Sequence, residues 1–307
     1  MNITGGFTAL GHCCVDYLCQ VDRIPVDLKI EAQSHLTQGG GPSATAAAAA
    51  SRLGMSAAFI GSAGDDPSGQ IIRQEFSKDS VDISGLAIRP NCTSTTAFCW
   101  VDSAGRRSIV WYRGSGPELS ADEVPESLVS NASILHLDGH QLSAANHAVQ
   151  IARRAGVLTA IDAGTLRPGV YELCQLCDIV IVSEKFAVSL SGRNEPEAAL
   201  RKLTELDAAI VGITLGPRGS ICFDRPSGKI VRCPAFPVDP VVDTTGAGDV
   251  YHAAFELFYH ETRDTPACMR FAAAAAGLKC RKPGGRTGIP SRSEAESVMN
   301  SILVEIL

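Results

Sequence analysis

The sequence lacks long hydrophobic runs and any excess of positive charge. No apolar stretch among its 307 residues approaches the roughly 20 residues that a helix needs to span a bilayer, so no membrane-spanning helix is expected. The net charge of −6 at pH 7 provides no basic field for nucleic acid or for an anionic membrane surface. Residues 1–6 lack the basic region and apolar core of a signal peptide, so we expect a cytoplasmic protein.

Two common phosphate-binding motifs are also missing. The P-loop pattern G-x-x-x-x-G-K-[ST] does not occur, and the dinucleotide fingerprint G-x-G-x-x-G fails because Tyr251 occupies the third glycine position. The eleven cysteines are an odd number spread through apolar segments, which is typical of buried free thiols. Cys174-x-x-Cys177 has no second CxxC and no histidine pair with zinc spacing, so we do not expect a metal there.

The composition is that of a globular protein in which strands alternate with helices. Hydrophobic residues make up 45% and charged residues 20% of the chain. Strands are predicted at 7–14, 57–60, 134–138, 158–162, 179–183 and 208–214, and helices at 43–54, 68–78, 142–155 and 168–176. This alternation predicts a mostly parallel sheet with helices on both faces. His12, inside the first apolar run, is expected to be a core histidine.

Two segments depart from the alternation. Residues 93–113 are typical of a β-hairpin with a polar turn at 102–105. Together with residues 16–38, the hairpin is expected to build a small separate sheet that acts as a lid or as a dimer contact.

The stretch 241–250, VVDTTGAGDV, places a glycine-rich turn at the start of a helix. Free N–H groups at a helix start bind anions, and glycines let a ligand approach the backbone closely. Asp249 adds a carboxylate, and we expect the helix start to keep its pKa low. The stretch therefore predicts transfer of a negatively charged group to a nucleophile that must lose a proton.

Other polar residues are expected at one edge of the sheet, because ligands of parallel sheets bind at the carboxyl ends of the strands. The residues at or just beyond such ends are Asp16, Asp138, Asp162, Glu184 and Thr214. The triplet Gly39-Gly40-Gly41 is either a flexible loop or a hinge whose N–H groups meet a hydroxylated ligand. The basic residues Lys279, Arg281, Lys282 and Arg286 either touch nucleotide phosphates or form a charge cluster at a helix end.

Three motifs carry a resemblance to a known family: GGGPSATAAAAASRLG at 39–54, TLGPRG at 214–219 and DTTGAGD at 243–249. Over essentially its whole length, the chain resembles the ribokinase-like, or PfkB, carbohydrate kinases. The resemblance implies one Rossmann-like α/β domain over 1–307 with a small β-sheet lid formed by about 16–38 and 93–113. It also implies ATP and Mg2+ as co-substrates. Residues 278–290, LKCRKPGGRTGIP, look most like the sulfofructose kinase branch.

The resemblance also implies roles for individual residues. Asp249 matches the catalytic base, and Gly246, Ala247 and Gly248 match the anion hole around the transferred phosphoryl group. The residues expected to hold the sugar are Asp16, Lys29, Gly39, Gly40, Gly41, Trp111, Asp138 and His140, with Lys29 as a sulfonate contact. From its place at the end of the lid, Arg113 either contacts a phosphate or sulfonate on the substrate or is a solvated strand residue, and His140 has a structural role as its alternative. Those expected to bind the nucleotide are Thr214, Gly216, Gly219, Thr245 and Gly285.

Two metal sites follow from the same resemblance. The magnesium motif N-x-x-E of the family reads Ser183-Glu184-Lys185-Phe186 here, which leaves Glu184 to hold Mg2+ through water. Asp243, with Thr245 and the turn near Gly285, resembles a site for a monovalent cation such as K+.

We therefore predict an ATP-dependent kinase that phosphorylates a hydroxyl, most simply a primary one, of a small sugar or sugar derivative. A homodimer through the lid sheet is expected, with neither nucleic acid nor membrane as a partner. Two alternatives are a nucleoside kinase of the same family and a catalytically silent sugar-binding regulator, which the incomplete N-x-x-E motif would favour.

Overall fold

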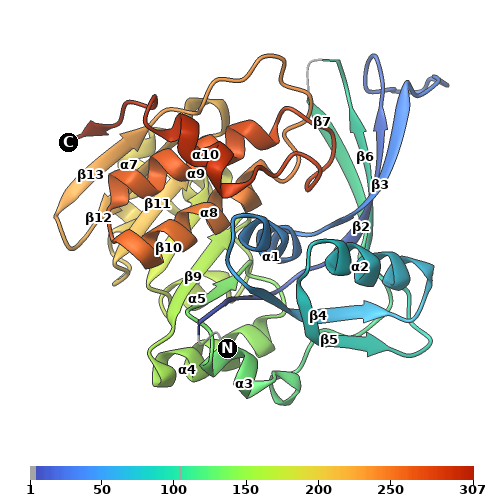
Figure 1. Ribbon diagram of the computed structural model, residues 1–307, viewed down its shortest axis with the longest axis horizontal. Helices are drawn as coiled ribbons and strands as arrows, with labels where there is room; N and C mark the ends of the chain where they lie inside the picture. Colours follow the sequence, from blue (N-terminus) through green and yellow to red (C-terminus); the bar gives the residue numbers. More distant parts are fainter. Residues whose placement is uncertain (1–4, 104–105) are drawn as a thin grey trace.

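The computed structural model of the protein describes residues 5–103 and 106–307. Within these ranges, ten strands form a large sheet and four form a small one. The small sheet stands at one side of the α/β body (Figure 1). No helix in the described ranges is both long enough and apolar enough to cross a bilayer.

The large sheet is parallel from β11 to β5 and antiparallel at its other edge. In spatial order its strands are β14 (Glu305–Ile306), β13 (Lys229–Cys233), β12 (Ser220–Asp224), β11 (Ile210–Thr214), β10 (Ile179–Ser183), β9 (Leu158–Ala163), β8 (Ile134–Leu137), β1 (Phe7–Leu10), β4 (Ala57–Gly64) and β5 (Asp82–Arg89). The predicted mostly parallel, Rossmann-like sheet is confirmed. Strand β5 was not expected, because its sequence DISGLAIR mixes polar and apolar residues at the edge of the sheet.

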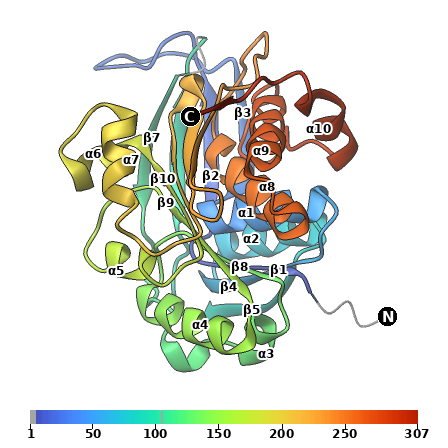
Figure 2. The ribbon, with the colours of Figure 1, turned by 90° about the vertical axis from the view of Figure 1, so that its left-hand side faces the viewer.

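Helices cover both faces of this sheet (Figure 2). The first face carries α1 (Pro42–Arg52), α2 (Pro67–Lys78), α8 (Ala247–Thr262), α9 (Thr265–Lys279) and α10 (Arg292–Met299). The second carries α3 (Glu126–Ser130), α4 (Leu142–Ala155), α5 (Val170–Cys174), α6 (Glu184–Ser191) and α7 (Pro196–Leu203), and short 3-10 turns occur at η1 (Ala121–Glu123) and η2 (Gly216–Arg218). The alanines of α1 are fully buried, because a helix of small residues can pack closely against both the sheet and α8.

The small sheet has the order β3 (Ser34–Gly40), β2 (Cys14–Gln20), β6 (Thr96–Val101) and β7 (Arg107–Tyr112). The predicted hairpin is confirmed as β6 and β7, although Ala104 and Gly105 of its predicted turn lie outside the described residues. Because side chains alternate along a strand, the register places Asp16, Ala97 and Trp111 on one face. We call this face, which carries Asp16, the inner face.

The prediction of one strand over 7–14 is wrong. Strand β1 ends at Leu10 and β2 begins at Cys14, so the chain leaves the large sheet and enters the small one within three residues. Gly11 has no room for a Cβ atom, which would overlap the carboxylate of Asp138. His12 therefore lies in the crossing between the sheets rather than in the core.

The eleven cysteines all lie in the described ranges and are free thiols, nine of them buried. The prediction of mostly buried free thiols is confirmed.

Candidate active site

Helix α8 begins at the glycine-rich turn and presents free N–H groups there. Gly246 caps the helix with φ 75°, and a Cβ atom on it would lie 2.7 Å from the carbonyl oxygen of Gly285. The N–H of Ala247 donates to the carbonyl of Thr244 at 3.2 Å. Gly248 and Asp249 follow as the second and third helical residues, whose N–H groups have no acceptor within the helix. The turn therefore has the geometry of an anion site.

The pKa of Asp249 does not stay low at this helix start. Burial raises the pKa of Asp249 to about 7, and the nearby carboxylate of Asp162 adds to the shift. The expectation of a low pKa is wrong, because the loss of hydration outweighs the helix dipole and the opposing charges of Arg107 and His136. Asp249 is consequently a stronger base than an ordinary carboxylate.

Asp16 lies on the inner face of the small sheet and opens toward the same space. Its Oδ1 accepts a hydrogen bond from Sγ of Cys14 at 3.2 Å, and a Cβ atom on Gly40 would overlap its carboxylate. Burial raises the pKa of Asp16, and its charge in turn raises that of Asp249. The structure thus brings Asp16, Gly40 and Asp249 together.

The glycine triplet is an ordered junction between β3 and α1 rather than a flexible loop. The N–H of Gly39 donates to Oε2 of Glu75 at 3.3 Å, so it is used within the protein. Gly41 caps α1 with φ 96°, and a side chain there would meet the backbone of His12. The N–H of Gly39 is therefore not free to meet a ligand, as the hinge alternative requires.

The buried carboxylate of Asp138 binds the backbone of three segments. Its carboxylate accepts the backbone N–H groups of His12 at 2.8 Å, Ser43 at 3.2 Å and His140 at 2.9 Å. As a result, the rings of His12 and His140 stack with centroids 4.8 Å apart. Trp111, 54% exposed on the inner face, approaches His12 edge-on at 6.2 Å.

The stacked histidines are neutral at pH 7. Burial lowers the pKa of His12 to about 4, and the neighbouring His140 adds to the shift. Burial likewise lowers the pKa of His140, whose Nδ1 lies 3.3 Å from Nη1 of Arg167. Arg113 is paired with Glu118 at the exposed edge of this region.

Lys29 lies away from the other residues that were expected to hold the sugar. It lines a hollow of about 380 Å³ together with Cys19 and Trp100. Cys19 is three residues from Asp16 along β2 and therefore points to the opposite face of the small sheet. The structure does not bring Lys29 together with Asp16.

The predicted nucleotide loop follows β11. Thr214 ends the strand, Gly216 opens η2 with φ 58°, and Gly219 has φ 86°. A Cβ atom on Gly219 would overlap the carbonyl of Cys233, so this position requires glycine. Glu184 begins α6 beside this loop, where it forms an ion pair with Arg218.

Arg107 is a site residue that sequence reasoning missed. It lies in β7, and its Nη1 donates to Oγ1 of Thr244 in the glycine-rich turn at 3.0 Å. This hydrogen bond joins the small sheet to the anion site. Strand alternation from Trp111 places residue 107 on the same face, so the hairpin sequence contained the signal.

Three members of a buried polar cluster beneath α8 were also missed: His136, His252 and Glu256. Nδ1 of His136 lies 2.9 Å from Oε1 of Glu256, and Nε2 of His252 lies 3.3 Å from Oδ1 of Asp162. Although burial alone would lower it, the charge of Glu256 raises the pKa of His136 to about 8. Burial raises the pKa of Asp162 to about 7. The spacing of residues 249, 252 and 256 on one helix face was the available signal.

Replacement of Glu256 by Gln is expected to weaken the pH dependence of stability. The pKa of His136 is about 8 in the folded state and about 6.5 in the unfolded state. Its protonation therefore stabilises the folded state fully below pH 6.5, and this contribution is lost as the pH rises through about 8. The contribution is about 1–2 kcal/mol, and thermal unfolding between pH 6 and 9 would measure it. Glu261→Gln, an exposed change on the same helix, is the control. An unchanged slope in Glu256→Gln would contradict the assignment.

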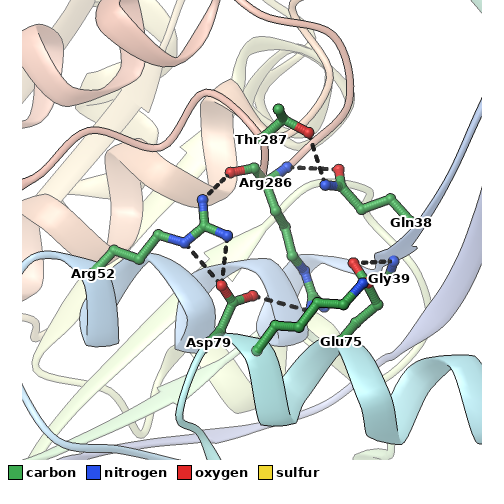
Figure 3. A network of polar contacts seen from close by, with 8 residues as sticks. Gln38, Gly39, Arg52, Glu75, Asp79, Arg286 and Thr287 are labelled. Carbon is green, nitrogen blue, oxygen red and sulfur yellow. Dashed lines mark hydrogen bonds and ion pairs between the residues drawn. The ribbon is translucent and has the colours of Figure 1, made fainter.

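Gln38 connects the small sheet to the loop after α9. Its Nε2 donates to Oγ1 of Thr287 at 2.9 Å, and its Oε1 accepts the N–H of Arg286 at 3.0 Å (Figure 3). Since Gly285 of the same loop lies against Gly246, this link reaches the anion site.

The four basic residues that were expected to touch phosphates or to cluster at a helix end differ in their burial. Arg286 is buried, with Nη1 3.6 Å from Oδ2 of Asp79, and Arg52 binds both that carboxylate and the carbonyl of Arg286 (Figure 3). Lys279 is also buried, whereas Arg281 and Lys282 are exposed at the end of α9.

The fold and the site define a class of enzyme. A parallel α/β sheet, an anion-binding helix start and a partly buried carboxylate beside it are suited to transfer an anionic group to a hydroxyl.

Comparison with known proteins identifies the family. The model described as pfkB family carbohydrate kinase matches residues 7–292, and the chain belongs to this family. A ribokinase of Arabidopsis thaliana is 30% identical over 313 residues, covering 97% of this chain and 81% of the relative. A nucleoside kinase of Methanothermobacter thermautotrophicus is 27% identical over 301 residues, covering 94% and 93%.

Solved structures show the same fold. Arabidopsis thaliana ribokinase complexed with ribose and ATP superposes with a TM-score of 0.84 at 27% identity, covering 97% of this chain and 99% of that one. Ribokinase of Thermotoga maritima gives a TM-score of 0.79 at 24% identity, with 96% and 99% coverage. The protein is therefore a sugar or nucleoside kinase of the ribokinase-like type.

Proposed function

We propose that this protein is an ATP-dependent kinase that transfers the γ-phosphoryl group to a primary hydroxyl of a small sugar or sugar derivative. The observation that carries the proposal is the position of Asp249. Its pKa is raised to about 7, it lies at the helix start formed by Gly246, Ala247 and Gly248, and it shares a space with Asp16.

In the proposed reaction, Asp16 accepts hydrogen bonds from sugar hydroxyls and orients the reacting one toward Asp249. Asp249 takes the proton of that hydroxyl as the hydroxyl oxygen attacks the γ-phosphorus of ATP. The bond between this phosphorus and the bridging oxygen breaks, and ADP leaves with its electron pair. The N–H groups of Gly248 and Asp249 stabilise the charge that develops on the transferred group. With a pKa near 7, Asp249 is matched to this task at neutral pH.

The expected nucleotide and metal sites agree with this reaction. The loop with Thr214, Gly216 and Gly219 lies at the carboxyl end of β11, beside Glu184 at the end of β10. Mg2+ usually keeps several waters and binds one or two carboxylates plus phosphates, so a single carboxylate such as Glu184 fits an outer contact. When bound, the ion would neutralise phosphate charge. The ribokinase of Arabidopsis binds ATP and ribose, and an Escherichia coli protein of the same fold binds ATP and Mg2+.

The small sheet would act as a lid that excludes water from the reaction. The hydrogen bond from Arg107 to Thr244 supports this role, since it joins the sheet to the anion site. The outer face exposes Phe98, Val110 and Tyr112, which supports a homodimer through this sheet.

A nucleoside kinase is the second candidate. Trp111 is half exposed on the inner face and offers an aromatic surface on which a base could stack. The similarity to a nucleoside kinase at 27% identity also supports this candidate.

The test is ADP release with ATP and Mg2+ over a panel of pentoses, hexoses, sugar acids and nucleosides. Stimulation by a sugar above all nucleosides is the expected result. Stimulation by nucleosides alone would establish the second candidate. Binding of a sugar without ADP release from any panel member would refute kinase activity and favour a regulator.

A further inference from the structure

Lys279 is a fully buried lysine directly beneath the anion site. It is the last residue of α9 and is 0% exposed. Its Nζ donates to the backbone carbonyl of Asp243 at 2.8 Å, at the start of the DTTGAGD turn. Burying an ammonium group is costly unless negative charge surrounds it, so its presence here calls for a function.

The surroundings favour a cation at this point. The carboxyl end of α9 carries the negative end of the helix dipole. Burial lowers the pKa of Lys279, and the charges of Asp243 and Asp249 oppose that shift. Both carboxylate oxygens of Asp243 are already bound, Oδ1 by the N–H of Thr245 and Oδ2 by that of Gly284, each at 2.8 Å. The carbonyl of Asp243 is thus left for the ammonium.

The residues do not fit the monovalent cation that the family resemblance suggests near Asp243, Thr245 and Gly285. A metal ion beside Asp243 would need oxygen ligands, but the carbonyl of Asp243 already accepts from Nζ of Lys279, and both of its carboxylate oxygens accept backbone N–H groups. A second positive charge beside the ammonium would be repelled in a buried site. Oγ1 of Thr245 is buried without a hydrogen-bond partner, so the turn still offers an oxygen to a cation if Lys279 is removed.

We propose that the ammonium group of Lys279 is a built-in cation that replaces a monovalent metal ion under the anion hole. It holds the carbonyl of Asp243 and thereby the turn that leads to Gly246. Its charge adds to the field of the N–H groups that receive the phosphoryl group. Catalysis then proceeds without K+. The inference rests on the proposed kinase function.

The first experiment compares turnover of the wild-type enzyme in KCl and in tetramethylammonium chloride at equal ionic strength. Rates equal within about twofold are expected, since no ion site is left to fill. Lys279→Met is expected to lose at least about tenfold in kcat in tetramethylammonium and to regain part of it in KCl. Lys229→Met, at an exposed lysine in β13, is the matched control and should behave as wild type.

The second experiment reads ion binding without catalysis. The thermal unfolding temperature of wild type should be the same in both salts, whereas that of Lys279→Met should rise with K+. A saturable K+ effect on the wild type would overturn the proposal, even if the variant does not fold. A folded Lys279→Met with wild-type turnover, or one that neither binds K+ nor is rescued by it, would also overturn it. Absence of turnover in the wild type would instead refute the kinase function and leave the unfolding comparison valid.

Discussion

Asp249→Asn is expected to lower kcat by about three orders of magnitude, the loss typical for a general base, while KM for the sugar changes much less. The amide has the size of the carboxylate and leaves the helix start intact, but it cannot accept the proton of the attacking hydroxyl. Steady-state ADP release measures both constants. Asp207→Asn, at the exposed amino end of β11, is the control and should be neutral.

The pH profile separates loss of a base from loss of structure. The pKa of Asp249 is raised to about 7, and the base acts when deprotonated, so kcat/KM of the wild type should rise with pH through about 7. The pKa of Asp162 is also raised to about 7, and its charge interacts with that of Asp249. The rise of kcat/KM with pH therefore reports the titration of both carboxyl groups together. The residual activity of Asp249→Asn should not show this rise of kcat/KM through about pH 7. Turnover within a few-fold of wild type would refute the role of Asp249 as base.

Asp16→Asn is expected to reduce kcat/KM for the sugar by about 100-fold, the value of a strong charge-assisted hydrogen bond. Most of the loss should appear in KM, because Asp16 holds hydroxyls that do not react. The same substitution should not lower the stability of the folded protein. Burial raises the pKa of Asp16 above its unfolded value, so its ionised form opposes folding at neutral pH.

Thermal unfolding at pH 8 therefore tests whether Asp16 is retained for function. The unfolding temperature of Asp16→Asn should equal or exceed that of wild type. Asp27→Asn, in the connection between β2 and β3, is a matched control because asparagine tolerates its φ of 52°. A clear loss of stability in Asp16→Asn would mean that its carboxylate supports the sheet instead of the substrate.

Local patterns in the sequence were sufficient for most of the framework. Buried strands such as β10 and β11 are continuous apolar runs, and the glycine and proline residues between elements mark their ends. Ser291 and Glu294 form a capping box at the start of α10, and their spacing in the sequence is typical of this motif. The DTTGAGD stretch predicted a helix start with free N–H groups, because that property depends only on neighbouring residues.

The sequence by itself therefore determined the mostly parallel sheet, the hairpin and the anion turn, all of which depend on short-range periodicity and turn chemistry. Only the tertiary structure decided that the chain changes sheets at Gly11, that Arg107 reaches Thr244, and that Lys29 does not reach Asp16. It also decided the pKa of Asp249 and the placement of Lys279 under the same turn. The reason is physical: burial and long-range charges arise when segments far apart in sequence meet, and a local pattern does not contain them.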